Sequence, residues 1–403
     1  MKLDPQALRY LSKDEMRVLH ALEKGMRDTE HVPKDRIAVL SCLRGGWVMK
    51  ILSRLIRLKM VHFDQKHGYK LTYSGLDMLA LSTFQKRGSL AGVGRRIGVG
   101  KESDIHEGVT PDGTEVVVKL HRLGRTSFRA IKQKRDYVKR RQKSEGMVWM
   151  HYSKLSAFKE YSYMKALYEE GFVVPEPIDC NRHCVVMSKV QGRPLLHVKA
   201  ASNPESIMQQ GLQMIVDLAL SGLIHCDFNE FNLMLSDSEI LTMIDFPQIV
   251  SVNHPNAKEL FDRDVRGMCR FMANRFKVEV EDPPEFASIV TEKIKEAANQ
   301  RRTYLRKTRP TAAALEIDSE AEVSELEDND HDESEMGSEA EADLEDNDHN
   351  ESDNNDESDN NDESDNNDES DNEEPNEIIS SVASTHKPHA EIKVCDVPHM
   401  SHG

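Results

Sequence analysis

The sequence predicts an α+β protein in which two folded domains precede an acidic tail, and three observations support this. Segments with apolar residues at helical spacing alternate with short β-branched runs along the first three quarters of the chain. Residues 316–375 hold 30 Asp and Glu and no Lys or Arg, whereas the rest of the chain has 40 acidic and 53 basic side chains. The remaining length is enough for two domains of roughly 100–200 residues each.

Residues 1–90 have the pattern of a winged-helix domain, which is three helices and a small hairpin, followed here by a further helix. The first helix follows a capping signal at Ser12 and Glu15. The other expected elements are helices at residues 34–43 and after Gly46, strands at 60–63 and 69–72, and a last helix with Leu76, Leu79 and Ala80 inward.

The third helix presents Lys50, Arg54 and Arg57 on the face opposite its apolar residues. Such a stripe is suited to phosphate contacts with RNA. A solvated helix face in a protein-docking module would look the same, because basic residues opposite an apolar face are common. The pattern favours neither alternative over the other.

A glycine-rich loop opens the second domain at residues 97–103. Gly98 and Gly100 allow a hairpin to lie close over phosphates, and Lys101 and Ser103 could contact them. Ser103 takes the place of the third glycine of the usual pattern. A tight turn would need the same glycines.

A β-branched run ends in Lys119, some twenty residues after this loop, as expected of the lysine that contacts the α- and β-phosphates. A lysine of this kind needs a carboxylate to hold it. Glu160 is the candidate because it lies within an amphipathic helix at residues 154–168, whereas Glu169 and Glu170 lie at the helix end.

The stretch LIHCDFNEFNLML at residues 223–235 places polar side chains between two apolar arms. His225, Asp227 and Asn232 have the spacing H-x-D-x-x-x-x-N of a phosphoryl-transfer loop. Asp227 would orient the attacking hydroxyl or water, Asn232 would bind Mg²⁺, and His225 would brace the loop. A polar hairpin turn is the plainer alternative.

Asp245 follows an apolar strand, as the metal-binding Asp of D-F-G does, although Pro247 replaces the glycine. The chain then reaches a helix at 259–276 with no A-P-E and no room for an extended activation segment. The platform on which ordinary protein kinases bind a peptide is therefore expected to be missing. The buried strand at 185–187 would lead into a hinge between two lobes.

Residues 122–143 form a basic insertion with ten Lys or Arg and one acidic residue. Its charge density exceeds what solubility requires, so we expect it to contact RNA. The alternative is a solvated loop.

Residues 316–403 are predicted to be disordered, because the repeats ESDNND and LEDNDH offer too little apolar surface to fold. A solvated acidic spacer is the favoured function, ahead of a nucleic-acid mimic or a chaperone-docking tail. The N-terminus lacks a signal peptide's apolar core, no apolar run could span a membrane, and scattered cysteines indicate a reduced, intracellular protein.

The stretches GVGKESDI, KLHRLGRTSFR, HCDFNEFN, MIDFPQ and HPNAKELFDRDV, with the winged helix, resemble the RIO family of atypical kinases. Within it they are most similar to the winged-helix-bearing subfamily, the second RIO kinase. The resemblance leaves out the acidic tail. Cys226 departs from it, since the family usually has Gly before the catalytic Asp, and so does Ser188, where an acidic residue is commoner.

The resemblance implies a two-lobed RIO-type kinase fold, and we place the boundaries accordingly. The expected divisions are the winged helix at 1–90, the kinase domain at 94–285 with lobes at 94–188 and 192–285, a basic helical extension at 286–315, and the tail at 316–403.

The resemblance also implies ATP and Mg²⁺ as cofactors and non-specific serine/threonine kinase activity; ATPase activity is also expected. Lys119 would bind ATP, Asp227 and Asp245 would be catalytic, and Asn232 and Asp245 would bind the metal. The residues expected to bind the nucleotide are Gly98, Gly100, Lys101, Ser103, Lys119, Glu160, Met187, Ser188 and Val190.

The role implied is maturation of the small (40S) ribosomal subunit precursor, including late rRNA processing, in a cytoplasmic protein that shuttles through the nucleus. Its partner would be the pre-40S particle, with RNA bound by residues 122–143 and the winged helix. Two other functions share parts of the pattern: an aminoglycoside-type small-molecule phosphotransferase and a catalytically silent RNA-binding scaffold. Neither explains the whole set of motifs.

Overall fold

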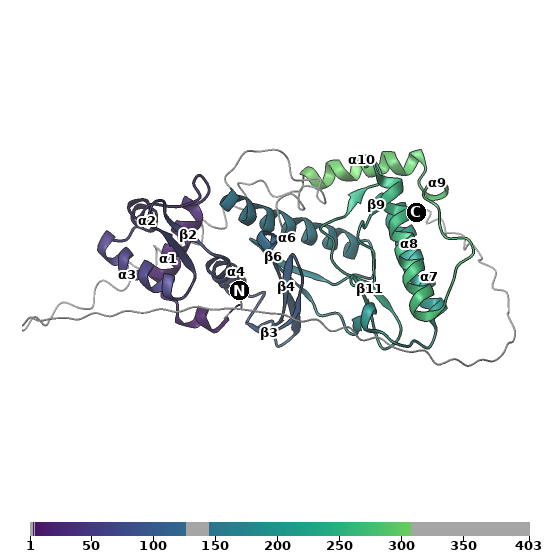
Figure 1. Cartoon of the computed structure of the whole chain (residues 1–403), viewed down its shortest axis with the longest axis horizontal. Helices are drawn as coiled ribbons and strands as arrows, with labels where there is room; N and C mark the ends of the chain where they lie inside the picture. The colour runs from purple at the N-terminus through teal and green to yellow at the C-terminus, as the bar shows by residue number, and fades with distance from the viewer. Residues whose placement is uncertain (1–2, 4, 126–144, 308–403) are drawn as a thin grey trace, which may run out of the picture. The chain divides into compact units, whose positions relative to one another are not determined.

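The computed structural model describes residue 3, residues 5–125 and residues 145–307. The predicted acidic tail and most of the basic insertion lie outside these residues. Among the described residues, no helix is long and apolar enough to cross a membrane. Figure 1 shows the order of the elements from the winged helix in purple to the last helix in green.

The N-terminal winged helix is confirmed. Its elements are η1 (Pro5–Tyr10), α1 (Lys13–Gly25), α2 (Lys34–Ser41), α3 (Gly45–Arg57), β1 (Val61–Asp64), β2 (Gly68–Leu71) and α4 (Tyr73–Arg87). The expected capping box is present at the start of α1, because the Ser12 side chain accepts from the backbone N–H of Glu15 and Glu15 accepts from that of Ser12.

The expected bounds of α2 and of both hairpin strands were wrong by one or two residues. α2 ends at Ser41 rather than at residue 43, because Cys42 adopts a left-handed conformation with φ 55° that cannot continue a helix. The hairpin strands pair Val61 with Leu71, so each lies one residue away from its expected position.

The first lobe is a five-stranded antiparallel sheet with one long helix. Its elements are β3 (Gly92–Val99), β4 (Ser103–Val109), β5 (Glu115–His121), η2 (Leu123–Arg125), α6 (Glu145–Glu169), β6 (Pro177–Asn181) and β7 (Cys184–Ser188), with strand order β3-β4-β5-β7-β6. α6 begins earlier than the predicted residue 154.

The second lobe is mainly helical, and α7 and α8 lie side by side in it (Figure 1). Its elements are β8 (Arg193–Pro194), η3 (Leu195–His197), α7 (Pro204–Leu220), β9 (Leu223–Ile224), β10 (Leu233–Leu235), β11 (Leu241–Met243), β12 (Val250–Ser251), α8 (Ala257–Phe276), α9 (Phe286–Ile289) and α10 (Glu292–Lys307). β9 pairs with β12, and β10 pairs with both β8 and β11, so each arm of the catalytic-loop stretch is held by strand pairing.

The first lobe's sheet separates two apolar cores. Val116, Val118 and Leu120 of β5 belong to the core of the winged helix, whereas Val185 and Met187 of β7 belong to the core of the second lobe. Successive side chains of a strand point to opposite faces, so one strand serves both cores. The winged helix therefore packs on the back of the sheet that carries Lys119.

Candidate active site

Lys119 is the centre of the site. It lies on β5 with 6% of its surface exposed, and its Nζ is 2.5 Å from Oε1 of Glu160 and 2.7 Å from Oδ1 of Asp245. Burial lowers the pKa of Lys119, but Asp245 and Glu160 raise it more, so the net shift is upward. The ammonium group is charged and held between two carboxylates.

Glu160 comes from α6 and is 1% exposed, whereas the side chain of Glu169 at the helix end is 64% exposed. The second carboxylate oxygen of Glu160, Oε2, lies 2.8 Å from Nε2 of His121. His121 was not predicted as a site residue. The sequence could have indicated His121, because it follows Lys119 by two residues and so lies on the same face of β5.

The carboxylate of Asp227 is surrounded by amides. Nδ2 of Asn229 donates to its Oδ1 at 2.9 Å, while Nδ2 of Asn232 and Nε2 of Gln248 donate to its Oδ2 at 3.1 and 2.9 Å. Asn229 and Gln248 were not predicted. Three donors from two segments fix the orientation of the carboxylate, and Asp227 is half-buried.

Asp264 of α8 anchors the backbone of this loop. Its carboxylate accepts from the backbone N–H of Cys226 at 2.8 Å and of Phe228 at 3.3 Å. Burial raises the pKa of Asp264 to about 7, against the lowering effect of these donors. Sequence reasoning missed this residue, because nothing local links it to a loop 38 residues earlier.

Asp245 adopts a left-handed backbone conformation with φ 71°, and its side chain is 36% exposed. Burial raises its pKa, but the Lys119 ammonium lowers it more, so Asp245 stays ionised. Asp245 and Asn232 are adjacent, because the backbone N–H of Ile244 donates to the Asn232 carbonyl at 2.9 Å. The structure thus brings Lys119, Asp227, Asn232 and Asp245 close together.

His225 is buried between Phe228 and Phe246, with ring centroids 5.7 and 5.9 Å away. Burial lowers the pKa of His225 to about 4, so the imidazole is neutral. It packs beneath the loop, as expected of a bracing residue.

The donor set fits a magnesium ion. The two hydrogen bonds of the Asn232 side chain both use Nδ2, which leaves its amide oxygen as the ligand atom beside the Asp245 carboxylate. Hard oxygen ligands from one or two side chains, completed by phosphate oxygens, are what Mg²⁺ prefers. No group of three or more His, Cys, Asp or Glu in the described ranges could hold a metal by itself.

The predicted phosphate loop is the turn between β3 and β4. The backbone N–H of Gly100 donates to the Ser103 carbonyl at 2.7 Å, Lys101 is exposed, and Gly98 passes close to Ile105. A Cβ at Gly98 would lie 3.3 Å from the Ile105 side chain, which explains the small residue there.

The hinge residues lie where expected, at the end of β7, with Met187 buried and Ser188 and Val190 partly buried. Ser188 is already engaged on both sides: its N–H donates to the Glu176 carbonyl and its Oγ accepts from the Glu176 N–H, both at 2.9 Å. The backbone N–H of Ser188 is therefore used within the protein, whereas these contacts use neither its carbonyl oxygen nor its hydroxyl hydrogen.

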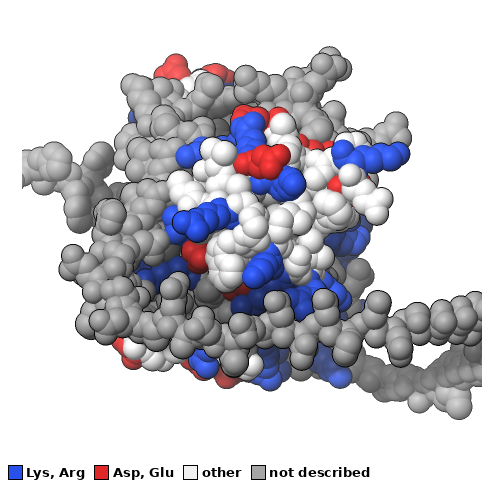
Figure 2. Space-filling view, turned by 90° about the vertical axis from the view of Figure 1, so that its left-hand side faces the viewer, with Lys and Arg blue, Asp and Glu red and all other residues white. Residues whose placement is uncertain are grey.

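Several of the cations predicted to bind RNA form ion pairs within the protein, Arg122, Arg125 and Arg54 among them. Arg122, the first residue of the predicted basic insertion, is 3% exposed, and Arg54 of α3 is 3.1 Å from Oε1 of Glu15. Arg122 is therefore not available to phosphate, whereas the side chain of Arg54 remains 47% exposed. Residues 126–143 lie outside the described part of the chain. Figure 2 shows Lys and Arg side chains around a region of uncharged residues, at the end of the molecule where Figure 1 labels α2 and α3.

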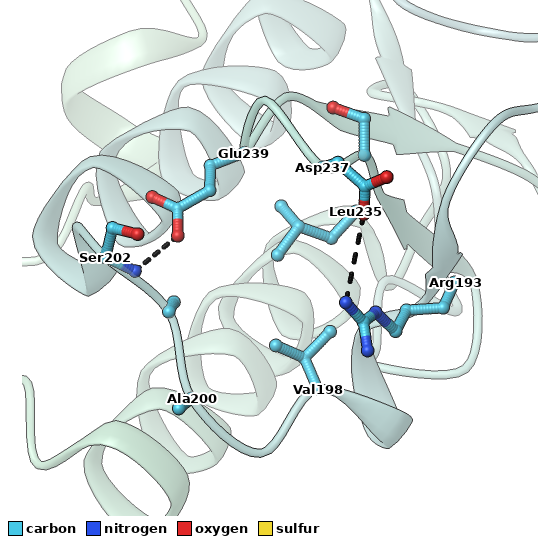
Figure 3. A pocket seen from close by; sticks show the side chains of 9 residues that line it. Arg193, Val198, Ala200, Ser202, Leu235, Asp237 and Glu239 are labelled. Carbon is cyan, nitrogen blue, oxygen red and sulfur yellow. Dashed lines mark hydrogen bonds and ion pairs between the residues drawn. The ribbon is translucent and has the colours of Figure 1, made fainter.

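A separate hollow of about 370 Å³ lies in the second lobe (Figure 3). Arg193, Leu235, Asp237 and Glu239 are among its lining residues, and the Glu239 carboxylate accepts from the backbone N–H groups of Ser202 and Asn203. None of its lining residues was predicted to bind nucleotide or metal.

Two family models match the chain: a RIO domain at residues 104–285 and an N-terminal domain described as Rio2 at residues 8–87. A serine/threonine-protein kinase rio2 of Dictyostelium discoideum is 49% identical over 288 residues, which is 71% of this chain and 55% of that protein. A serine/threonine-protein kinase rio2 of Schizosaccharomyces pombe is 41% identical over 293 residues, covering 72% of this chain and 84% of that protein.

Among solved structures, a Rio2 kinase–ADP/Mg²⁺–phosphoaspartate complex from Chaetomium thermophilum is similar to this fold. It has a TM-score of 0.65 and 39% identity, and the match covers 81% of this chain and all of that one. The chain spans about half the length of the Dictyostelium relative.

Proposed function

Because the chain belongs to the RIO2 family of serine/threonine-protein kinases, we propose that it is an ATP- and Mg²⁺-dependent kinase and ATPase. The observation that carries the proposal is the buried Lys119 ammonium bonded to both Glu160 and Asp245, next to the amide-held Asp227. This arrangement suits phosphoryl transfer, which depends on positioning and charge neutralisation.

Each side chain has a distinct role in this proposal. Lys119 contacts the α- and β-phosphates, and the Asn232 and Asp245 oxygens bind Mg²⁺, which neutralises charge on the phosphates when bound. Asp227 orients the attacking hydroxyl or water. The ADP and Mg²⁺ of the Chaetomium complex support these assignments.

We further propose that Asp245 is a transient phosphoryl acceptor. One carboxylate oxygen attacks the γ-phosphorus, the bond to the ADP oxygen breaks, and water then hydrolyses the acyl phosphate to inorganic phosphate. Asp245 is suited to this because it is ionised and its side chain is partly exposed. The phosphoaspartate of the Chaetomium complex supports the proposal.

The cellular role we propose is maturation of the small (40S) ribosomal subunit precursor, including late cytoplasmic rRNA processing. The protein would bind the pre-40S particle through the winged helix and residues 126–143, and would be cytoplasmic with shuttling through the nucleus. The exposed Lys50 and Arg57 on α3 support an RNA contact there.

A single-turnover assay with γ-labelled ATP and purified pre-40S particles tests this function. We expect label to appear on the protein as an acid-stable but base-labile and hydroxylamine-labile acyl phosphate, and then as inorganic phosphate. Label accumulating as phosphoserine on a particle protein, without matching phosphate release, would contradict the ATPase proposal. An Asp245→Asn variant is the control for the acyl phosphate.

A further inference from the structure

A cluster of buried charges joins the winged helix to the strands that carry the phosphate loop. At its centre is Arg122, whose guanidinium donates to both oxygens of Asp77 on α4, at 2.6 and 2.8 Å. Its Nε donates to Oδ2 of Asp104 on β4, at 3.1 Å. Arg122, Asp77 and Asp104 are each no more than 3% exposed.

Further groups complete the cluster. Arg125 donates to both oxygens of Asp104, at 2.8 and 2.6 Å, and Nε2 of His183 lies 2.7 Å from Oδ1 of Asp77. Burial raises the pKa of Asp77, but Arg122 and His183 lower it more, so Asp77 is ionised. The two carboxylates and two guanidinium groups therefore compensate one another.

The position of the cluster in the sheet gives it a link to the nucleotide site. Ser103 and Asp104 are consecutive on β4, and His121 and Arg122 are consecutive at the end of β5, where Ser103 pairs with His121. Consecutive side chains point to opposite faces. Ser103 and His121 therefore face the nucleotide site, and Asp104 and Arg122 face the winged helix.

We propose that Arg122 is a positioning residue for nucleotide binding, held in place by Asp77 of the winged helix. Arg122 fixes the end of β5 to the start of β4, both through Asp104 and through its own N–H, which donates to the Glu102 carbonyl at 2.5 Å. The distance between the phosphate loop and Lys119 is thus set before ATP binds. The winged helix is then part of the nucleotide site.

The chain contains a matched control for this proposal. Arg182, in the turn between β6 and β7, donates to both oxygens of Glu23 on α1, at 2.9–3.1 Å, and both residues are less than 10% exposed. This second cluster also joins the winged helix to the first lobe. It does not involve β4 or β5, so losing it removes interface stability without moving the phosphate loop.

The test compares Arg122→Lys with Arg182→Lys in the full-length protein. Lysine keeps the positive charge but cannot form the bidentate hydrogen bonds of the arginine guanidinium. We expect both variants to lower the unfolding temperature. Arg122→Lys should also raise KM for ATP about tenfold, a loss of about 1.4 kcal/mol, with kcat within about twofold. Arg182→Lys should leave KM unchanged.

Asp77→Asn and the fluorescence of Trp149 keep the proposal testable if Arg122→Lys does not fold. Trp149 lies against Tyr73, with ring centroids 3.9 Å apart, and Arg122 lies 5.0 Å over the same Tyr73 ring. In a Trp47→Phe background, where Trp149 is the single tryptophan, Asp77→Asn should shift the Trp149 emission, because Arg122 loses its partner beside Tyr73, and it should raise KM for ATP as Arg122→Lys does.

Either of two results would overturn the proposal. The first is an equal rise in KM for Arg122→Lys and Arg182→Lys, which would show that both act only through interface stability. The second is an unchanged KM for ATP in Asp77→Asn, in the Trp47→Phe protein, although its Trp149 emission shifts.

Discussion

At the scale of single residues, two residues of the site have backbone conformations that L-residues rarely adopt. Cys226 has φ 66° and Asp245 has φ 71°. Such conformations cost of order 1–3 kcal/mol each and persist where the surroundings fix them. At Cys226 the surroundings are Asp264, which accepts from its N–H, and Arg263, which donates to its carbonyl.

The strain at Cys226 predicts an unusual order of stability. Cys226→Gly should be more stable than Cys226→Ala by about 1 kcal/mol, because only glycine tolerates φ 66° without a steric penalty. In regular structure the order is the reverse. Urea unfolding of the two variants, with equal m-values, measures the difference. A more stable alanine variant would contradict the strain argument.

Replacing Asp227 with alanine should abolish phosphoryl transfer while leaving ATP affinity within about threefold, since Lys119, Asn232 and Asp245 remain. Single-turnover kinetics and titration with a fluorescent nucleotide separate the two effects. Asn253→Ala, a change on the distant contact with α10, is the control. Turnover equal to that of the wild-type protein would refute the role of Asp227.

Asp264 predicts a pH dependence of stability. Its folded pKa of about 7 lies above its usual value of 3.8, so its contribution is fully present below pH 3.8 and is lost as the pH rises through about 7. Relative to Asp264→Asn, the wild-type protein should lose on the order of 2 kcal/mol between pH 5 and 8. Parallel unfolding curves for the two proteins would show that the backbone donors hold Asp264 ionised throughout.

At the scale of elements, α3 shows how one helix divides its cations. Arg54 binds Glu15 and the Tyr10 carbonyl, whereas Lys50 lies 5.9 Å from the centre of the exposed Trp47 ring and Arg57 is exposed. In the sequence, Lys50, Arg54 and Arg57 form one basic stripe and cannot be told apart. The Arg54 side chain stays 47% exposed while it makes these contacts, so all three cations reach the surface and Arg54 is also tied to the rest of the domain.

The division on α3 predicts different effects of the three residues on RNA binding. Lys50→Ala and Arg57→Ala should each weaken binding and reduce the salt slope by about one. Arg54→Ala should mainly lower the unfolding temperature. Filter binding of pre-rRNA at several salt concentrations measures the slopes. An unchanged slope in the first two variants would place the RNA contact elsewhere.

At the scale of the whole molecule, the winged helix and the first lobe share an apolar core and two buried charge clusters. Removing one partner of a buried pair leaves a charge without compensation, which costs about 3–5 kcal/mol. The interface is thus specific as well as extensive. The two domains should unfold together.

The buried carboxylates of this interface predict its response to acid. Burial raises the pKa values of Glu23, Asp77 and Asp104, but their arginine and other partners lower them more. Their contribution to stability is present above their usual pKa values near 4 and is lost as the pH falls through the lowered folded values. Thermal unfolding between pH 6 and 3 should show a fall in stability that Glu23→Gln reduces.

The sequence by itself determined the elements and the chemistry of the site. Helical spacing, the Ser12 capping box and the strand ending in Lys119 are local signals, and Lys119, Asp227, Asn232 and Asp245 were recognisable from their motif spacing. Such signals survive in sequence because they depend on residues a few positions apart.

Only the tertiary structure decided which groups meet. Lys119 contacts partners 41 and 126 residues away, Asp227 is held by Gln248 from another segment, and Arg122 is buried against the winged helix rather than available for RNA. These contacts depend on how the strand faces and helices pack. No local pattern encodes that, because burial is a property of the folded chain.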